Sequence, residues 1–202
     1  MSNPIIKTVD LCYKYGKFTA VNNLSVEIMK GEVVSLTGAN GAGKTTFIKM
    51  LSGILTPFSG EMFIGADKSY MSQTSALLAN MTARENYGFY GVINGFSKAE
   101  IENKFGLASD ILGLEMFKNK RVEELTSGWR QLLSFSIAIM RNPGVLLLDE
   151  PTAGVDTLTR GKIWGFIRRL SDCGTTVMVT SHYASESAMC HRNINIFRPE
   201  QC

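Results

Sequence analysis

Short runs of apolar residues alternate along the chain with longer stretches in which apolar residues recur every three or four positions. The runs at 33–37, 145–150 and 176–180 are almost entirely apolar at their centres, which is typical of strands buried on both faces of a parallel sheet. Further strands are predicted where shorter or alternating runs occur, at 5–11, 24–28, 61–64, 69–71 and 194–197. The pattern therefore predicts a mixed α/β fold.

Helices are predicted between these strands. Two helix starts have the capping-box spacing, a serine or threonine followed three residues later by a glutamate, at Thr82 and at Ser97. Apolar residues recur at helical spacing after residue 46, from 125 to 140 and after residue 156, and a short helix is expected near 184–190. The region from about 74 to 140 is thus expected to be mostly helical and inserted between strands.

An apolar and aromatic cluster lies in this helical region. It comprises Leu77, Leu78, Met81, Tyr87, Phe89 and Tyr90. The cluster is either the core of the helical region or a docking surface for a partner helix, and the sequence favours neither interpretation over the other.

The composition is that of an ordinary globular protein. The chain has 202 residues, enough for one well-packed domain, and 45% of them are hydrophobic. The formal charge of +3, from 21 Lys and Arg against 18 Asp and Glu, does not call for a nucleic-acid partner. The N-terminus lacks the apolar core of a signal peptide, and no apolar run approaches the roughly 20 residues that cross a bilayer. We therefore expect a cytosolic chain with free thiols, for which any role at a membrane requires a partner.

The segment after the strand at 33–37 has the features of a phosphate-binding loop. It reads GANGAGKTT and stands between a predicted strand and a predicted helix, the context that this motif requires. Glycines let main-chain N–H groups approach phosphate oxygens, and the helix N-terminus adds its positive end. We expect Lys44 to reach the β- and γ-phosphates, Thr45 to place its hydroxyl on Mg²⁺, and Thr46 to reach the α-phosphate. The nucleotide-binding residues expected in this loop are Gly38, Asn40, Gly41, Ala42, Gly43, Lys44, Thr45 and Thr46.

Two adjacent carboxylates end the apolar run at 145–150. Asp149 and Glu150 stand at the carboxyl end of a predicted parallel strand, where ligands bind in α/β sheets. Asp149 suits coordination of Mg²⁺, directly or through water. Glu150 suits orienting or deprotonating a water that attacks the γ-phosphate.

A second anion site is predicted at the start of the helix at 125–140. Thr126 and Ser127 offer hydroxyls and Gly128 offers an unobstructed amide, a set that holds phosphate by the same dipole and N–H logic. Taken alone, these residues fit a plain helix cap better.

Two single residues also have two interpretations each. Tyr15 either stacks on an adenine or packs at a strand end, and alone the packing role is favoured. His182, at the end of the strand at 176–180, is either structural or in contact with a γ-phosphate.

Taken together and in order, these residues resemble the nucleotide-binding subunit of an ATP-binding-cassette (ABC) transporter, from about Tyr15 to Phe197. In that resemblance Tyr15 is similar to the adenine-stacking aromatic, 38–46 to the Walker A loop, and Gln73 to the glutamine that senses Mg²⁺ and the γ-phosphate. The signature motif then corresponds to 125–131, the Walker B strand with its catalytic glutamate to 146–150, the D-loop to 153–156, and the switch histidine to His182. The Trp-Arg-Gln after Gly128 and the Thr-Ser-His-Tyr at 180–183 look most like the single-cassette exporter branch.

The resemblance implies a fold and a set of roles. The fold is a P-loop NTPase, with a RecA-like, mostly parallel sheet core, an antiparallel β subdomain and an inserted α-helical subdomain at about 74–140, in a single domain over 1–202. The implied cofactors are ATP and Mg²⁺, with the metal held by Thr45, Gln73 and Asp149. The implied catalytic residues are Glu150, His182, Lys44 and Gln73.

The resemblance also implies partners. Two such domains pair head to tail, either as identical or as different chains, so that ATP held by Lys44 of one is capped by Thr126, Ser127 and Gly128 of the other. An integral membrane permease would dock near Gln73 and the apolar-aromatic cluster, placing the chain on the cytoplasmic face of the cell membrane. Nucleic acid is not expected as a partner.

The signature departs from the family pattern at one informative position. The family usually reads LSGGQ, whereas this chain reads LTSGW, so Ser127 replaces a glycine. The Ser127 side chain would either crowd the phosphate of the partner cassette or add a hydrogen bond to it.

Alternative functions stay open at this level. A cassette ATPase that acts on ribosomes or DNA is the closest alternative, although such relatives usually carry two cassettes or long insertions. An ATP-dependent binding module with little hydrolysis is supported by Ser127 alone. A GTPase switch is disfavoured because the chain has no NKxD motif, and a small-molecule kinase because the signature-like helix would have no task.

Overall fold

The computed structural model describes residues 3–74, 76–181 and 183–198. The chain divides into two compact units. One, called here the sheet unit, comprises Met1–Tyr70, Pro143–Glu150 and Ile167–Cys202. The other, the helical unit, comprises Met71–Asn142 and Pro151–Phe166. His182 lies outside the described residues.

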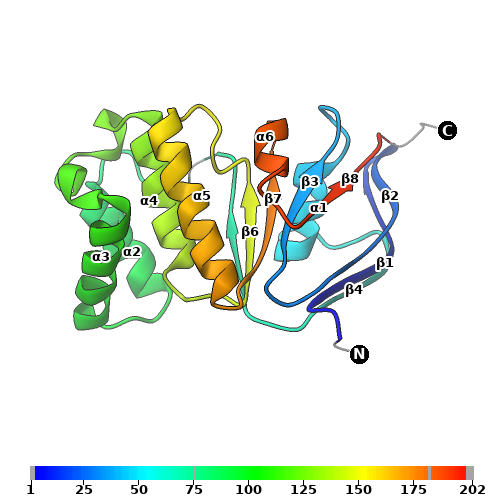
Figure 1. The fold of residues 1–202 in the computed structure, drawn as a ribbon, viewed down its shortest axis with the longest axis horizontal. Coiled ribbons are helices and arrows are strands. Elements are labelled where there is room, and N and C mark those ends of the chain that lie inside the picture. Colours follow the sequence, from blue (N-terminus) through cyan, green and yellow to red (C-terminus); the bar gives the residue numbers. More distant parts are fainter. Residues whose placement is uncertain (1–2, 75, 182, 199–202) are drawn as a thin grey trace. The chain divides into compact units, whose positions relative to one another are not determined.

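The described strands form two sheets (Figure 1). The antiparallel sheet has the order β2-β1-β4 and is built from β1 (Ile6–Tyr15), β2 (Phe18–Ile28) and β4 (Ser59–Ile64). The second sheet has the order β5-β6-β7-β3-β8 and is built from β3 (Val33–Thr37), β5 (Lys68–Met71), β6 (Val145–Asp149), β7 (Thr176–Thr180) and β8 (Arg192–Asn195). In this sheet β3 pairs in parallel with β7 and β8, and β6 with β7. The carboxyl ends of the three apolar strands therefore meet at one edge.

The described helices follow the predicted order. They are α1 (Lys44–Ser52), α2 (Ala83–Ile93), α3 (Lys98–Leu112), α4 (Ser127–Ile139), α5 (Thr157–Asp172) and α6 (Ala184–Ser187), with 3₁₀ turns at Leu114–Phe117 and Val122–Glu124. Both expected capping boxes are present, since Thr82 and Ser97 cap α2 and α3 and exchange hydrogen bonds with Glu85 and Glu100. These reciprocal bonds satisfy backbone donors that the first helical turn leaves unpaired.

The core of the sheet unit explains why its central strands are so apolar. All five residues of β6 and of β7 are buried, and α1 packs against β6 and β2. The helix contributes Phe47, Ile48, Met50 and Leu51 to this core. Burying one such side chain stabilises the fold by roughly 1.5–3 kcal/mol, which fixes α1, and with it the preceding loop, on the sheet.

The helical unit has its own aromatic core. Tyr87 of α2 packs edge-on against Phe105 of α3 with ring centroids 5.2 Å apart, and Phe117 stacks on Trp129 of α4 at 5.1 Å. Burial raises the pKa of Tyr87 to about 12. Phe89, by contrast, is 40% exposed. The apolar-aromatic cluster is therefore divided between core and surface.

Several predicted boundaries were wrong. The strands at 5–11 and 24–28 extend to Tyr15 and start at Phe18, because the β1–β2 hairpin keeps pairing through polar residues up to Tyr15↔Phe18. The last strand starts earlier than 194, since Arg192 pairs with Val34, and ends at Asn195. Ile54 continues the helical spacing of apolar residues after residue 46, but it lies beyond the end of α1. The helix stops because Gly53 adopts a left-handed conformation, and the Ile54 side chain is exposed. The short helix α6 ends at Ser187 instead of near 190.

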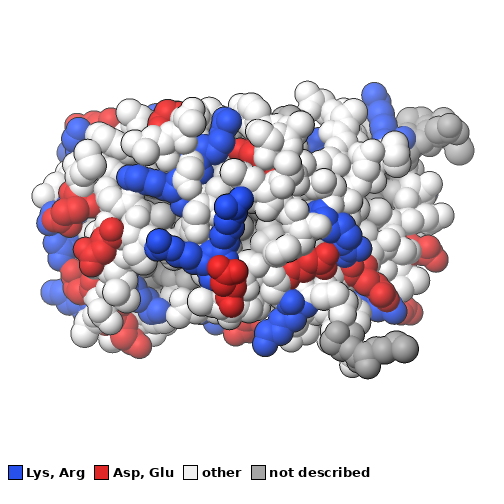
Figure 2. Space-filling view, in the orientation of Figure 1, with Lys and Arg blue, Asp and Glu red and all other residues white. Residues whose placement is uncertain are grey.

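Lys and Arg side chains gather over α5 on the face of the molecule in Figure 2. Lys162, Arg168 and Arg169 are all exposed on this helix, whose opposite side buries Ile163 and Ile167. The basic side chains thus form a solvated helix face, as their spacing predicts. Across the described residues, the helices are each too short or too polar to span a membrane.

Candidate nucleotide-binding site

Three glycines shape the loop between β3 and α1, and all have positive φ. Gly38, Gly41 and Gly43 have φ of 145°, 77° and 99°. A Cβ at Gly38 would lie 2.3 Å from the carbonyl oxygen of Ile196, and one at Gly43 would lie 2.2 Å from that of Ala20. At Gly38 and Gly43, both the backbone angle and the lack of space for a Cβ require glycine. At Gly41, the backbone angle alone favours it.

Lys44 lies at the centre of this loop. Its side chain is 6% exposed, and Nζ donates to the carbonyl oxygens of Gly38 (2.8 Å) and Ala39 (3.0 Å). Gly43 caps α1 without a side-chain bond, and the first turn of α1 contains no acidic residue. The ammonium group and the N-terminal amides of α1 thus concentrate positive charge where the sequence predicts phosphate binding.

Asp149 is the buried acceptor beside the loop. It is 1% exposed, and its Oδ1 accepts from Thr45 Oγ1 (3.1 Å) and Thr180 Oγ1 (2.7 Å). Tyr70 Oη donates a longer bond to Oδ2 (3.5 Å), and burial together with the Asp149 charge raises the pKa of Tyr70. The hydroxyl of Thr45 and the carboxylate of Asp149 are hard oxygen ligands side by side, a donor set that fits Mg²⁺.

Glu150 follows Asp149 in an uncommon backbone conformation. Its φ is 52°, a left-handed value that costs a non-glycine residue about 1–3 kcal/mol and is maintained here by the surrounding structure. Its N–H donates to Thr180 Oγ1 (2.9 Å), the same hydroxyl that donates to Asp149. Thr180 therefore fixes both adjacent carboxylate residues at the end of β6.

A buried carboxylate is linked by hydrogen bonds to the two residues that flank position 182. Glu186 of α6 is 1% exposed and accepts from Ser181 Oγ (2.5 Å), which in turn accepts from the Tyr183 N–H (3.0 Å). Burial and the Glu186 charge also raise the pKa of Cys190 to about 11. The segment that the sequence predicts to carry a phosphate-contacting histidine is thus anchored before and after His182, which itself lies outside the described residues.

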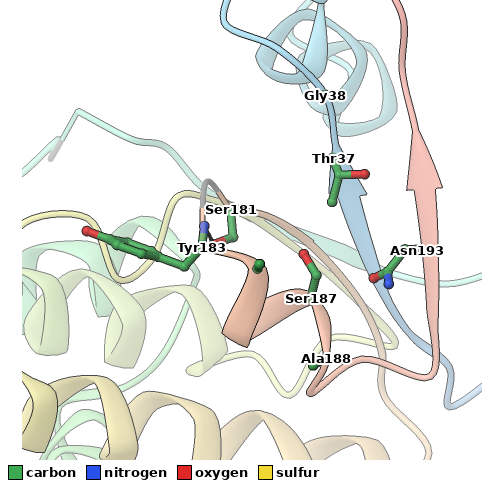
Figure 3. Close-up of a pocket in the computed structure, with 8 residues that line it drawn as sticks. Thr37, Gly38, Ser181, Tyr183, Ser187, Ala188 and Asn193 are labelled. Atoms are coloured by element: carbon green, nitrogen blue, oxygen red, sulfur yellow. Dashed lines mark hydrogen bonds between the residues drawn. The ribbon is translucent and has the colours of Figure 1, made fainter.

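A pocket of about 490 Å³ opens beside Gly38, between the end of β3 and α6 (Figure 3). Thr37, Ser181, Ser187 and Asn193 are among its lining, and Tyr183 points away from Thr37 and Ser187 in this view. All the lining residues are uncharged. The positive charge for a phosphate therefore comes from the loop and from Lys44, and not from this pocket.

The predicted second anion site lies in the helical unit. Thr126 caps α4 by accepting from the Trp129 N–H (3.3 Å), and Ser127 Oγ donates to the carbonyl oxygen of Gly154 (2.6 Å). A Cβ at Gly128 would lie 3.2 Å from Thr159 Oγ1, so glycine is also favoured there by space. The α4 N-terminus thus presents hydroxyls as expected, but Ser127 turns its own toward the D-loop-like segment.

Asp156 caps α5 within the same unit. Its carboxylate accepts from Thr159 Oγ1 (2.7 Å) and from the Thr159 N–H (2.9 Å). These bonds lower the pKa of Asp156.

Tyr15 and Gln73 were the remaining candidates. Tyr15 is half-exposed at the end of β1 and packs edge-on against Tyr13, with ring centroids 4.9 Å apart. Because Ala20 and Val21 of β2 lie against Gly43, the hairpin that carries Tyr15 borders the phosphate loop. Gln73 is exposed and belongs to the helical unit.

Thr180 and Tyr70 also contact Asp149, and neither residue is predicted from the sequence. Thr180 ends β7 directly opposite Asp149 in the parallel register, so a hydroxyl at the end of an apolar strand was the available signal. Tyr70 gave no comparable signal, because its bond to Asp149 depends on β5 lying beside β6.

Comparison with known proteins gives a family match. A family model described as "ABC transporter" matches residues 21–153. The probable multidrug ABC transporter ATP-binding protein YbhF of Escherichia coli (strain K12) is 34% identical over 206 residues, which cover 96% of this chain and 36% of YbhF. The taurine import ATP-binding protein TauB of Roseobacter denitrificans is 30% identical over 189 residues, covering 89% of this chain and 70% of TauB. The chain thus spans only about a third of the length of the first of these relatives.

Solved structures resemble the fold over nearly its whole length. A dimeric bacterial ABC transporter cassette has a TM-score of 0.85 and 26% identity, covering 96% of this chain and 94% of that one. A nucleotide-free ATP-binding cassette from an ABC transporter has a TM-score of 0.87 and 23% identity, covering 96% of this chain and 88% of that one. The predicted fold class is therefore confirmed.

Proposed function

The chain belongs to the ABC transporter family, and from this premise we propose that it binds and hydrolyses ATP as a transporter subunit and drives a separate membrane permease. The observation that carries the proposal is the contact between Thr45 and Asp149 (3.1 Å) beside a glycine loop that holds a buried lysine. Residues suited to binding the phosphates, the metal and the attacking water lie together there. Relatives named for multidrug transport and taurine import support the transport role.

In the proposed reaction the loop binds the phosphates of ATP. Lys44 exchanges its bonds to the loop carbonyls for the β- and γ-phosphates, and the amides at the start of α1 hold phosphate oxygens. Thr45 and Asp149 would hold Mg²⁺ through their hydroxyl and carboxylate oxygens. When bound, the metal neutralises charge that develops on the phosphates.

Glu150 is the proposed catalytic base. Its left-handed backbone and the bond from its N–H to Thr180 set its carboxylate at the carboxyl end of β6. From there Glu150 orients and deprotonates the water that attacks the γ-phosphate. His182 is the proposed contact to the γ-phosphate, on the turn that Ser181 and Glu186 anchor.

A second cassette completes each site in this proposal. Thr126, Ser127 and Gly128 of one chain cap the ATP that the phosphate loop of the other chain binds, while Tyr15 stacks on the adenine. The dimeric cassette among the similar solved structures supports the pairing of two cassettes.

The permease is the proposed membrane partner. We propose that it docks near Gln73 and the exposed Phe89. Phe89 belongs to the inserted helical region at about 74–140, and the whole chain, 1–202, is proposed to be a single cassette domain. The chain would then lie at the cytoplasmic face of the membrane. Capture of the tagged chain from membranes tests this assignment, because recovery with ribosomes or DNA and without an integral membrane protein contradicts it.

The catalytic proposal is tested by Glu150→Gln. The nucleotide contacts survive this change while water activation is lost, so ATP binding should persist and Mg²⁺-dependent turnover should be abolished. Wild-type turnover per chain should also rise with protein concentration, since a second copy completes the site. Near-normal hydrolysis by the variant would contradict the assigned base.

A further inference from the structure

Ser127 occupies a position at which the family signature usually has glycine, and its hydroxyl proton is used inside its own chain. Ser127 Oγ lies 2.6 Å from the carbonyl oxygen of Gly154, and both residues belong to the helical unit. A carbonyl oxygen only accepts, so the serine must donate. The start of α4 is therefore bonded to the segment at 153–156 that precedes α5.

A second contact joins the same two segments. A Cβ built at Gly128 would lie 3.3 Å from Asp156 Oδ2 and 3.2 Å from Thr159 Oγ1, so the α4 backbone already abuts the cap of α5. The cap itself is fixed by the two bonds from Thr159 to Asp156. Gly154 has φ of 67°, and its carbonyl oxygen accepts the Ser127 bond, which ties this turn of the segment to the start of α4.

The two hydroxyls at the α4 N-terminus consequently differ. Thr126 Oγ1 accepts from the Trp129 N–H, which leaves its own proton for an outside acceptor such as a phosphate oxygen. The Ser127 hydroxyl donates its hydrogen bond to the Gly154 carbonyl oxygen, so toward an incoming phosphate this hydroxyl offers only lone pairs. Hydrogen bonding to the partner's phosphate is therefore assigned to Thr126 and to the amides of α4.

We propose that Ser127 is a positioning residue that holds the segment at 153–156 against the start of α4. The two segments then have a fixed arrangement before they contact the partner cassette. This inference rests on the proposed function, because it assumes that these segments face the nucleotide of a second copy. Segments already ordered in the single chain lose less conformational entropy when two chains pair.

The test compares Ser127→Ala, Ser127→Gly and Ser127→Thr with the wild type. Ala removes the hydroxyl and keeps a Cβ, Gly matches the family signature, and Thr restores a hydroxyl. Hydrogen exchange of the backbone amides at 153–156, measured on the full chain without nucleotide, should be about fivefold faster in the Ala and Gly variants, the factor expected from one net hydrogen bond. The Thr variant should return toward the wild-type exchange rate.

The second readout is the protein concentration at which turnover per chain is half-maximal. It should rise about fivefold in the Ala and Gly variants, because the net hydrogen bond no longer orders the paired surface. The inference is overturned if exchange at 153–156 is unchanged in Ser127→Ala. It is also overturned if Gly, but not Ala, lowers the half-maximal concentration, since that result identifies crowding by the Cβ. Absence of ATPase in the wild type would refute the proposed function, while the exchange result would still decide the role of the bond.

Discussion

The contact between the phosphate loop and β2 leaves no room for a side chain at Gly43. Replacing Gly43 with Ala would place a Cβ 2.2 Å from the carbonyl oxygen of Ala20 and 3.1 Å from Val21 Cγ2. The oxygen is a backbone atom between Thr19 and Val21, which both pair with β1, so it cannot swing away as the end of a flexible side chain does. Either the loop or β2 must therefore move.

The expected loss of stability follows from two additive costs. A left-handed backbone costs a residue with a Cβ about 1–2 kcal/mol, and overpacking costs about 1–3 kcal/mol more, so Gly43→Ala should lose about 2–5 kcal/mol. Gly41 supplies the matched control, because its φ of 77° is also positive while no atom lies within 4 Å of its Cβ position. Gly41→Ala should lose only the backbone cost of about 1–2 kcal/mol.

Thermal unfolding followed by circular dichroism distinguishes the two variants. In a protein of this size each kcal/mol lowers Tm by roughly 2–4 °C, so Gly43→Ala should melt about 10 °C below the wild type and Gly41→Ala about 5 °C below it. ATP affinity should fall with stability in the Gly43 variant, because Gly43 is the N-cap of α1 and directly precedes Lys44. Equal melting temperatures for the two variants would refute the described contact with β2.

Three further predictions follow from the site and the caps. Lys44→Ala should weaken ATP binding itself, and an unchanged affinity in a calorimetric titration would count against the whole site assignment. Thr180→Val keeps the shape but leaves Asp149 and the Glu150 N–H short of a partner, so urea unfolding should show a loss of about 1–3 kcal/mol. Hydrogen bonds from the backbone and side chains of the helix caps lower the pKa of Glu85 and Glu100 below their ordinary 4.5. The two ionised carboxylates therefore stabilise the fold above pH 4.5. This contribution is lost as the pH falls through the lowered pKa values. Tm should thus fall less steeply below pH 4.5 in the double variant Glu85→Gln, Glu100→Gln, and an identical slope would argue against intact caps.

Local signals in the sequence were sufficient for the elements that frame the site. The apolar run at Val33–Thr37 and the glycine spacing after it depend on neighbours within about ten residues, and the structure has the strand at those bounds. Capping boxes are equally local, which is why the starts of α2 and α3 were predicted correctly at Thr82 and Ser97.

Features that depend on pairing between distant segments could not be predicted in the same way. The extension of β1 to Tyr15 comes from its partner β2, and the early start of β8 comes from β3. Likewise, the role of Thr180 follows from the register that sets it opposite Asp149, 31 residues earlier in the chain. The direction of the Ser127 hydroxyl depends on the path of a loop 27 residues away. The signature motif alone therefore does not decide whether this side chain crowds the partner's phosphate or adds a hydrogen bond to it.

The division of the chain into two units gives the peptide bonds at their boundaries a mechanical role. Two of the crossings lie between Tyr70 and Met71 and between Glu150 and Pro151. Tyr70 touches Asp149, and Glu150 is held by its left-handed φ and by Thr180. Two of the covalent links between the units therefore adjoin residues that are proposed to hold the metal and to orient the attacking water.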